Sequence, residues 1–262
     1  MPGDGGLNGT FNTMTGLLIG YARVSTNDQD LTAQKNALTL PARRGLRSVR
    51  GCGVGARRMS TRATEGWPLV GWAALGVAAL VAGLLVVYGT GSAGLGIVIR
   101  LTARVAVLLF LSAFVASSVR RVHRSPFTAW LLRNRRYLGV SFAVAHFTHL
   151  GALAVFAIRA PAEFFQRNGN FLVLGVGGLA YLLLVGMTVT SFNRTAAWIG
   201  RTWWGRLHVT GSYLLWFIFL QSYVGRALRE PALYAPIALA LVAALSLRIG
   251  VRLRRQGGAL DG

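Results

Sequence analysis

The sequence predicts an all-α integral membrane protein, a bundle of six transmembrane helices with a disordered N-terminal extension. Hydrophobic residues make up 53% of the 262 residues and charged residues only 13%, whereas about a quarter of the residues in a soluble domain are charged. From residue 67 onward, apolar runs recur at a length of about 20 residues, which as a helix crosses roughly 30 Å of hydrocarbon. The first 66 residues contain no such run.

The apolar runs are separated by polar loops, and each is long enough to cross a membrane. Buried helices of a soluble protein are the alternative, but this many apolar runs would leave too little polar surface to cover them. We therefore expect one six-helix domain over 67–252, followed by a short tail at 253–262. The expected spans are 67–89, 97–118, 137–158, 170–191, 203–225 and 231–250.

The basic residues indicate the orientation of the helices. A formal net charge of +21 would suit a nucleic-acid partner, because basic chains release counterions from phosphate backbones. The arginines, however, lie mostly between apolar runs and concentrate in alternate loops, as they do in the cytoplasmic loops of membrane proteins. We therefore expect membrane lipid around the helices, no nucleic-acid partner, and both termini in the cytoplasm. The arginine-rich segments contain Arg120, Arg121, Arg124, Arg133, Arg135 and Arg136 after the second span, and Arg252, Arg254 and Arg255 in the tail.

The N-terminal segment differs in character from the rest of the chain. Residues 17–38, which include the sequence YARVS, resemble the start of the resolvase/invertase serine recombinases, and the resemblance implies that Ser25 matches the serine that attacks DNA. The pattern stops after residue 40, and one strand with part of a helix cannot bury a core. We therefore expect a truncated fragment over 1–40, with a DNA recombinase remnant as a remote alternative. Residues 41–66 are rich in Gly and Arg, which predicts a disordered linker.

Three histidines lie within the expected spans. Ionisable side chains at membrane depth are functional candidates because burying them is costly, and a neutral imidazole is an axial ligand of haem iron. His146 and His149 are three positions apart on one helix and share a face, whereas His208 lies near the cytoplasmic end of the fifth span. A hydrogen-bonded interior role is the alternative for each. Arg100 and Arg104, near the outer end of the second span, are candidates to pair with carboxylates such as those of haem, or they extend toward the membrane surface.

Two segments around these histidines resemble a known family. The sequences RRYLGVSFAVAHFTHL and WWGRLHVTGSYLLWF are similar to the third and fifth helices of the ferric-reductase-like transmembrane domain. That family includes the haem-binding membrane subunit of the bacterial methionine sulfoxide reductase system, and the resemblance covers about residues 67–252. In it, Arg135, Arg136, Leu138 and Gly139 match the entrance of the third helix, His149 matches its ligand, and His208 matches the fifth-helix ligand.

The resemblance implies one b-type haem between the third and fifth spans, with His149 and His208 as axial ligands and His146 as an alternative. It also implies electron transfer across or within the inner (cell) membrane of a bacterium. No flavin- or nucleotide-binding segment follows the sixth apolar run. We therefore expect an oxidoreductase component whose electron donor, a quinol or a flavoprotein, and whose redox partner subunit are separate molecules.

The sequence departs from the family at one position. The family places a second histidine thirteen residues after the fifth-helix ligand, roughly 20 Å farther along the helix, and here that residue is Gln221. Glutamine is a poor ligand for b-type haem. In addition, His149 lies near the middle of its span and His208 near the end of its own, a vertical offset of roughly 10 Å. A haem-less bundle of the same family, acting as a scaffold or a transporter, is therefore the alternative.

Overall fold

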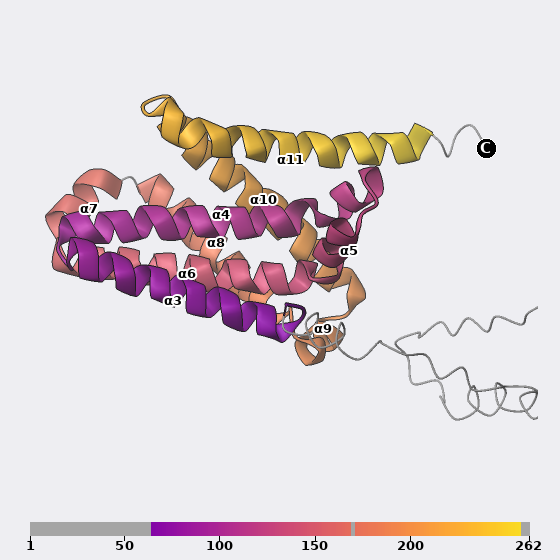
Figure 1. Cartoon of the computed structure of the whole chain (residues 1–262), viewed down its shortest axis with the longest axis horizontal. Helices are drawn as coiled ribbons and strands as arrows, with labels where there is room; N and C mark the ends of the chain where they lie inside the picture. Colours follow the sequence, from indigo (N-terminus) through magenta and orange to yellow (C-terminus); the bar gives the residue numbers. More distant parts are fainter. Residues whose placement is uncertain (1–63, 169–170, 258–262) are drawn as a thin grey trace, which may run out of the picture. The chain divides into compact units, whose positions relative to one another are not determined.

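The computed structural model describes residues 64–168 and 171–257, and every regular element among them is a helix (Figure 1). The predicted all-α class is therefore confirmed for this part of the chain. The recombinase-like fragment with Ser25 and most of the predicted linker lie outside the described residues, as does the end of the tail. The helices are α3 (Trp67–Tyr88), α4 (Ser92–Val122), α5 (Pro126–Arg133), α6 (Arg135–Arg159), α7 (Pro161–Asn168), α8 (Phe171–Val189), α9 (Asn193–Ile199), α10 (Arg201–Ala227) and α11 (Pro231–Gly257).

Four helices are long and apolar enough to cross a membrane, namely α3, α4, α6 and α11. The bent pair α8 and α9, whose axes meet at 107°, makes a fifth if the two form one span. The helix α10 has 27 residues, but it does not qualify, since polar side chains such as His208 and Gln221 interrupt its apolar sequence. The described chain thus contains four or five candidate spans, where the sequence predicts six.

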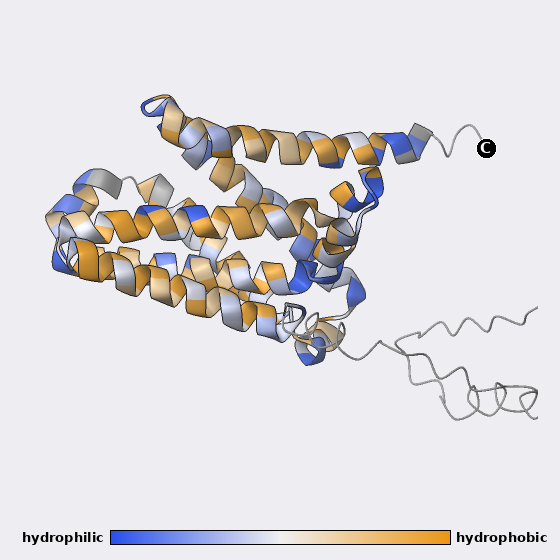
Figure 2. Ribbon diagram, in the orientation of Figure 1, coloured by the Kyte–Doolittle hydropathy of each residue, from blue (hydrophilic) through white to orange (hydrophobic). Residues whose placement is uncertain are grey.

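The surface of these helices is also typical of a membrane protein. Hydrophobic residues follow the helices along most of their length, and hydrophilic residues gather at the ends and loops (Figure 2). Large apolar side chains are widely exposed, with Val86 85% and Leu182 72% accessible, and α3 buries only Val77. Soluble proteins rarely expose contiguous apolar surface of this extent. Both features are consistent with a multi-pass membrane protein.

The helix α4 is central to the packing, because it contacts α3, α5, α6 and α11. A second set of contacts joins α10 to α8, α9 and α11. Aromatic rings connect the two sets: Phe110 of α4 lies 5.4 Å from Phe142 of α6 and 5.3 Å from Phe219 of α10, between ring centroids. Such aromatic pairs add about 0.5–1.5 kcal/mol each beyond the area they bury. The core thus fixes α6 and α10 relative to each other through α4.

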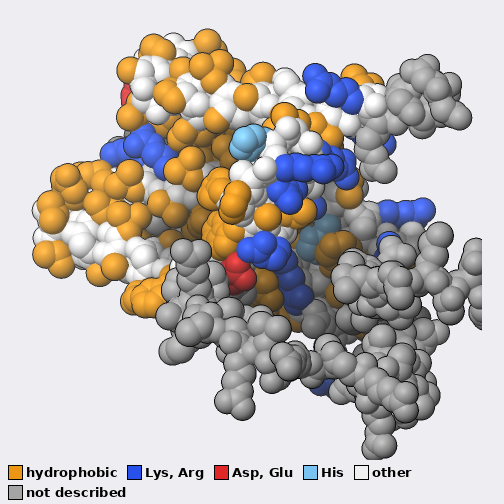
Figure 3. Space-filling view, turned by 45° about the vertical axis from the view of Figure 1, so that its right-hand side comes forward, with side chains coloured by type: hydrophobic (Ala, Val, Ile, Leu, Met, Phe, Trp, Pro, Cys, Tyr) orange, Lys and Arg blue, Asp and Glu red, His pale blue; other side chains and the backbone are white. Residues whose placement is uncertain are grey.

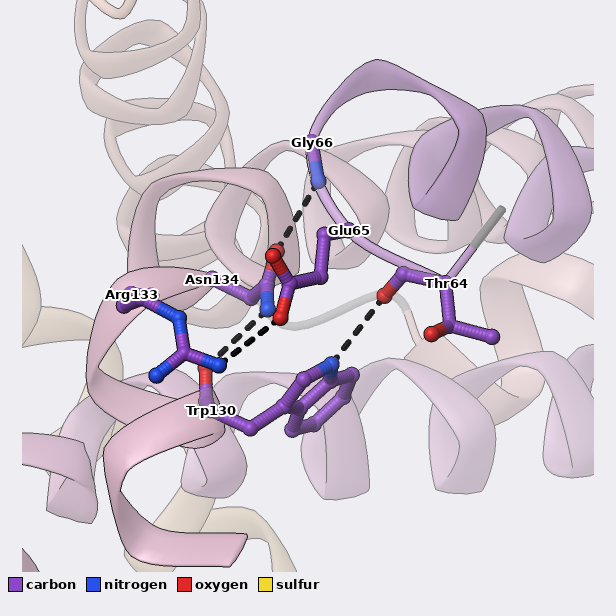
Figure 4. A network of polar contacts seen from close by, with 6 residues as sticks. All are labelled: Thr64, Glu65, Gly66, Trp130, Arg133 and Asn134. Carbon is purple, nitrogen blue, oxygen red and sulfur yellow. Dashed lines mark hydrogen bonds and ion pairs between the residues drawn. The ribbon is translucent and has the colours of Figure 1, made fainter. Parts of the chain in front are cut away.

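The chain enters this unit through a hydrogen-bonded junction (Figure 4). Asn134, between α5 and α6, is 1% exposed; its Oδ1 accepts from the Gly66 N–H at 2.9 Å and its Nδ2 donates to the Trp130 carbonyl at 3.0 Å. The Trp130 indole N–H donates to the Thr64 carbonyl at 3.1 Å. Residues 64–66, at the end of the predicted disordered linker, are therefore fixed against the helices, and the structured unit begins slightly earlier than the sequence indicates.

Candidate functional site

A cavity of about 570 Å³ lies mainly between α6, α8 and α10. Most of its lining is apolar, and its larger polar side chains are His146, His149, Tyr181, Gln221 and Arg226. Cofactor sites in proteins have this character, a mostly apolar cleft with a few convergent polar groups. Two of the three histidines that the sequence predicts to be functional therefore lie in one cavity.

The imidazole of His149 is held in a defined orientation. Its Nδ1 lies 3.0 Å from the carbonyl oxygen of Ile99 on α4. A carbonyl can only accept, so Nδ1 carries the proton and the lone pair of the neutral ring is on Nε2. The hydroxyl of Thr102 lies 3.4 Å from the same nitrogen, but its own proton is donated to the Val98 carbonyl at 2.7 Å. A backbone carbonyl that fixes the tautomer in this way is the usual support of a metal-binding histidine.

The ring of His146 is stacked among aromatic side chains. It is nearly parallel to the Tyr181 ring, at 4.8 Å and 17°, and to the His149 ring, at 5.4 Å and 13°, while Phe219 meets it edge-on at 5.5 Å. Its Nδ1 is buried and has no hydrogen-bond partner among the described residues. Because both histidines project from one face of α6, they cannot approach a single haem from opposite sides.

The third histidine is in a different place. His208 does not line the cavity, and it precedes Gln221, which does, by a helical rise of roughly 20 Å. Its Nε2 lies 3.1 Å from the hydroxyl of Thr190, and that hydroxyl donates its proton to the Gly186 carbonyl at 2.7 Å. In either tautomer the Nε2 atom of His208 is therefore occupied by the Thr190 hydroxyl. The Trp204 ring stacks on it at 4.4 Å. The structure thus brings His146 and His149 together and leaves His208 apart from them.

The structure places Arg100 and Arg104 in different environments. Arg100 is exposed, and its side chain forms no hydrogen bond or ion pair with the described residues. Arg104 is partly buried, its guanidinium lies 5.3 Å from the centre of the Tyr234 ring, and its Nε and Nη2 are buried without a partner among the described residues. Arg226 lies 5.9 Å from the same ring and also lines the cavity.

Sequence reasoning missed Arg226 as a site residue. In the sequence it is one of two arginines in a loop on the less basic side, and nothing distinguishes it from Arg229. The one available signal is its spacing, since Ile218, Ser222 and Arg226 follow one another every four residues and share a helix face, and all three line the cavity.

The space-filling view shows one face of the described helices (Figure 3). Hydrophobic side chains cover much of the described part of this face, and most of the basic side chains gather toward its right-hand side. No group of three or more His, Cys, Asp or Glu side chains that could hold a metal ion occurs within residues 64–168 and 171–257. A haem needs only one or two protein ligands. No protein-family model, curated protein or solved structure matches the chain.

Proposed function

We propose that the protein is a b-type haem protein of the bacterial inner membrane, similar to the ferric-reductase-like family, that transfers electrons as a component of a larger redox system. The observation that carries the proposal is the cavity lined by His149, whose Nδ1–H is donated to the Ile99 carbonyl and whose Nε2 is left as the ligand atom. The mostly apolar lining would exclude water from a haem plane. A haem bound there would supply reversible one-electron chemistry, tuned by its axial ligand and its surroundings.

In this proposal the chain's residues have distinct roles. His149 is the axial ligand, and His146 packs beside it with a buried Nδ1 that remains available as a second polar contact. Arg226 and Arg104 supply positive charge for haem carboxylates. His208 is assigned a structural role, because its Nε2 contacts the Thr190 hydroxyl and it lies outside the cavity. This assignment differs from the axial role that the family resemblance implies for His208.

The proposal includes six membrane spans with both termini in the cytoplasm. In it, α8 with α9 forms the fourth span and α10 forms the fifth, although α10 contains more polar residues than the other spans. The electron donor would be a quinol or a flavoprotein, and a separate redox subunit would accept or supply electrons. The second candidate is a haem-less bundle acting as a scaffold or transporter. The observation that favours it is Gln221, which lines the cavity at the position where the family has a ligand histidine.

Absorption spectroscopy of the full chain tests the proposal. The protein is expressed in membranes with haem supplied, purified in detergent, and measured oxidised and dithionite-reduced. We expect a reduced α-band with a shifted Soret band in the wild-type protein and in His208→Ala, and loss of haem in His149→Ala. If no preparation contains haem at stoichiometric yield, the proposal is wrong and the haem-less bundle is favoured. If His208→Ala loses haem and His149→Ala keeps it, a haem is bound elsewhere than in this cavity.

A further inference from the structure

The side chains of Arg104, Arg226 and Tyr234 form a cluster, here called the arginine pair, at the end of the cavity where α10 ends and α11 begins. The two guanidinium groups lie 5.3 and 5.9 Å from the centre of one ring, that of Tyr234, which is only 6% exposed. The ring of Tyr223, 3% exposed, lies 6.0 Å from the Tyr234 ring and also lines the cavity. The arginine pair is therefore continuous with the cavity through Arg226 and Tyr223.

The charges of the arginine pair are not compensated within the described chain. The ion pair recorded among the described residues joins Arg133 to Glu65 and involves neither Arg104 nor Arg226. Two nitrogens of Arg104 are also buried without a hydrogen-bond partner. A buried donor without an acceptor costs about 1–3 kcal/mol, and more when it is charged. Two like charges near one ring also repel each other, and although Arg226 is exposed and partly screened, a negative charge beside them would lower that cost.

Attraction to an aromatic ring compensates only part of this cost. A cation over a ring gains about 0.5–2 kcal/mol, and both guanidiniums must share the Tyr234 ring. The planar guanidinium group binds carboxylate and phosphate oxygens through paired N–H donors, and such charge-assisted bonds are roughly twice as strong as neutral ones. An anionic group beside Arg104 would accept from its two buried donors, and the positive charge of Arg226 near the same ring would strengthen that binding.

The shape of the cavity defines the rest of the ligand. Beyond Arg226 and the polar side chains around His149, the lining is dominated by leucine, alanine, glycine and phenylalanine. We infer that the arginine pair binds the anionic group, a carboxylate or a phosphate, of an amphipathic molecule whose apolar part lies in the cavity. This inference relies on the proposed membrane location but not on haem. Two sources have this chemistry, the phosphate of an anionic phospholipid and the carboxylates of a haem in the same cavity.

Binding of a defined phospholipid to the full chain tests the inference. Phosphatidylglycerol and phosphatidylcholine are added in detergent to protein prepared without haem, and bound lipid is measured by native mass spectrometry. The variants are Arg104→Gln and Arg226→Gln, and Arg226→Lys keeps the charge without the planar donors. The matched control is Arg206→Gln, since Arg206 is exposed like Arg226 and also lies over an aromatic ring, 5.1 Å from the centre of Trp203, but does not line the cavity.

We expect phosphatidylglycerol to bind in preference to phosphatidylcholine. In Arg104→Gln and Arg226→Gln its affinity should fall about tenfold, the effect of losing roughly one charge-assisted pair. In Arg206→Gln its affinity should be unchanged. If the lipid preference is absent but haem-supplied preparations of the two variants contain less haem, the anionic group is a haem carboxylate. If neither lipid binding nor haem content changes in either variant, the inference is wrong. Lipid binding in a protein that never binds haem would refute the proposed function and leave the inference standing.

Discussion

At the scale of single residues, Gln221 decides what the cavity can hold. It lines the cavity from α10, while the candidate ligand His149 lines it from α6. An amide is a weak ligand for haem iron, so a haem held by His149 would keep one axial position open to small molecules. The family pattern instead supplies a second imidazole at this position. Gln221 is therefore where the sequence departs from the family pattern that it resembles.

Gln221→His should fill the coordination position that the glutamine leaves open on a haem. An imidazole contributed from the α10 side of the cavity would occupy the open axial position, because imidazole is a strong ligand of haem iron. The wild-type reduced protein should show a carbon monoxide difference spectrum, and Gln221→His should lose most of it while its haem content is unchanged. Gln221→Asn, which keeps the amide, should behave like the wild-type protein. A carbon monoxide signal that is equally strong in Gln221→His would show that Gln221 does not face the haem.

Much of the candidate site could be found from the sequence, since imidazoles inside apolar runs are rare and costly. That reasoning placed His146 and His149 on one face of a helix, as the structure has them. It placed His208 at a different depth but kept it as a ligand, because its exclusion from the cavity depends on how α10 packs and on the contact of its Nε2 with the Thr190 hydroxyl. Arg226 was missed for the same reason. Arg226 of α10 becomes a candidate only because its guanidinium lies near the Tyr234 ring of α11, a contact that the sequence does not reveal.

At the scale of the helices, the corner between α3 and α4 depends on two glycines. Gly89 ends α3 with a φ of 74°, in the left-handed region that favours glycine. A Cβ atom at Gly94, in the first turn of α4, would meet the carbonyl oxygens of Gly89 and Tyr88 at distances that real Cβ atoms do not reach. These contacts are with backbone, which cannot move aside as a flexible side chain would. The glycine is therefore needed for α3 and α4 to pack closely.

The corner gives a matched pair of substitutions, Gly94→Ala and Gly96→Ala. We expect Gly94→Ala to destabilise the protein by about 1–3 kcal/mol, the usual cost of overpacking, because the backbone must shift. At Gly96 the nearest atom to an added Cβ is the end of the Arg100 side chain at 3.6 Å, an ordinary contact, so Gly96→Ala should be neutral or slightly stabilising, since alanine favours helix over glycine. Thermal unfolding in detergent compares the two. Equal midpoints would mean that the corner is looser than the structure shows.

Sequence periodicity located the long helices better than their ends and connections. The expected span 97–118 corresponds to α4, but the helix runs from Ser92 to Val122 and continues beyond the apolar run at both ends. The short helix α5 was not predicted. Its start is set by a capping box, in which the Ser125 hydroxyl accepts from the Thr128 N–H and the Thr128 side chain accepts from the Ser125 N–H. Such local hydrogen bonds fix helix ends independently of hydrophobic pattern.

At the scale of the whole chain, the sequence and the structure give different numbers of candidate membrane spans. The apolar runs predict six, whereas length and composition qualify α3, α4, α6 and α11, and a fifth if α8 and α9 form one span. The difference lies in α10. Some of its polar side chains have partners inside the protein, such as Thr190 for His208 and the Leu241 carbonyl for the Trp216 indole, and Gln221 faces the cavity. A helix that satisfies its polar groups against neighbouring helices can cross a bilayer at lower average hydropathy than a helix facing lipid.

Topology mapping with reporter fusions tests this argument. A fluorescent protein that folds only in the cytoplasm, or a phosphatase active only outside it, is fused after residues 91, 124, 160, 200, 229 and 257, each at or beside a helix end. If α10 crosses the membrane, positions 200 and 229 should report opposite sides, and position 257 should report the cytoplasm together with 124 and 200, as the arginine-rich segments predict. Positions 91, 160 and 229 should report the outside. If 200 and 229 report the same side, α10 does not cross the bilayer, and the proposed membrane arrangement of the cavity, which α10 lines with Gln221 and Arg226, must be revised.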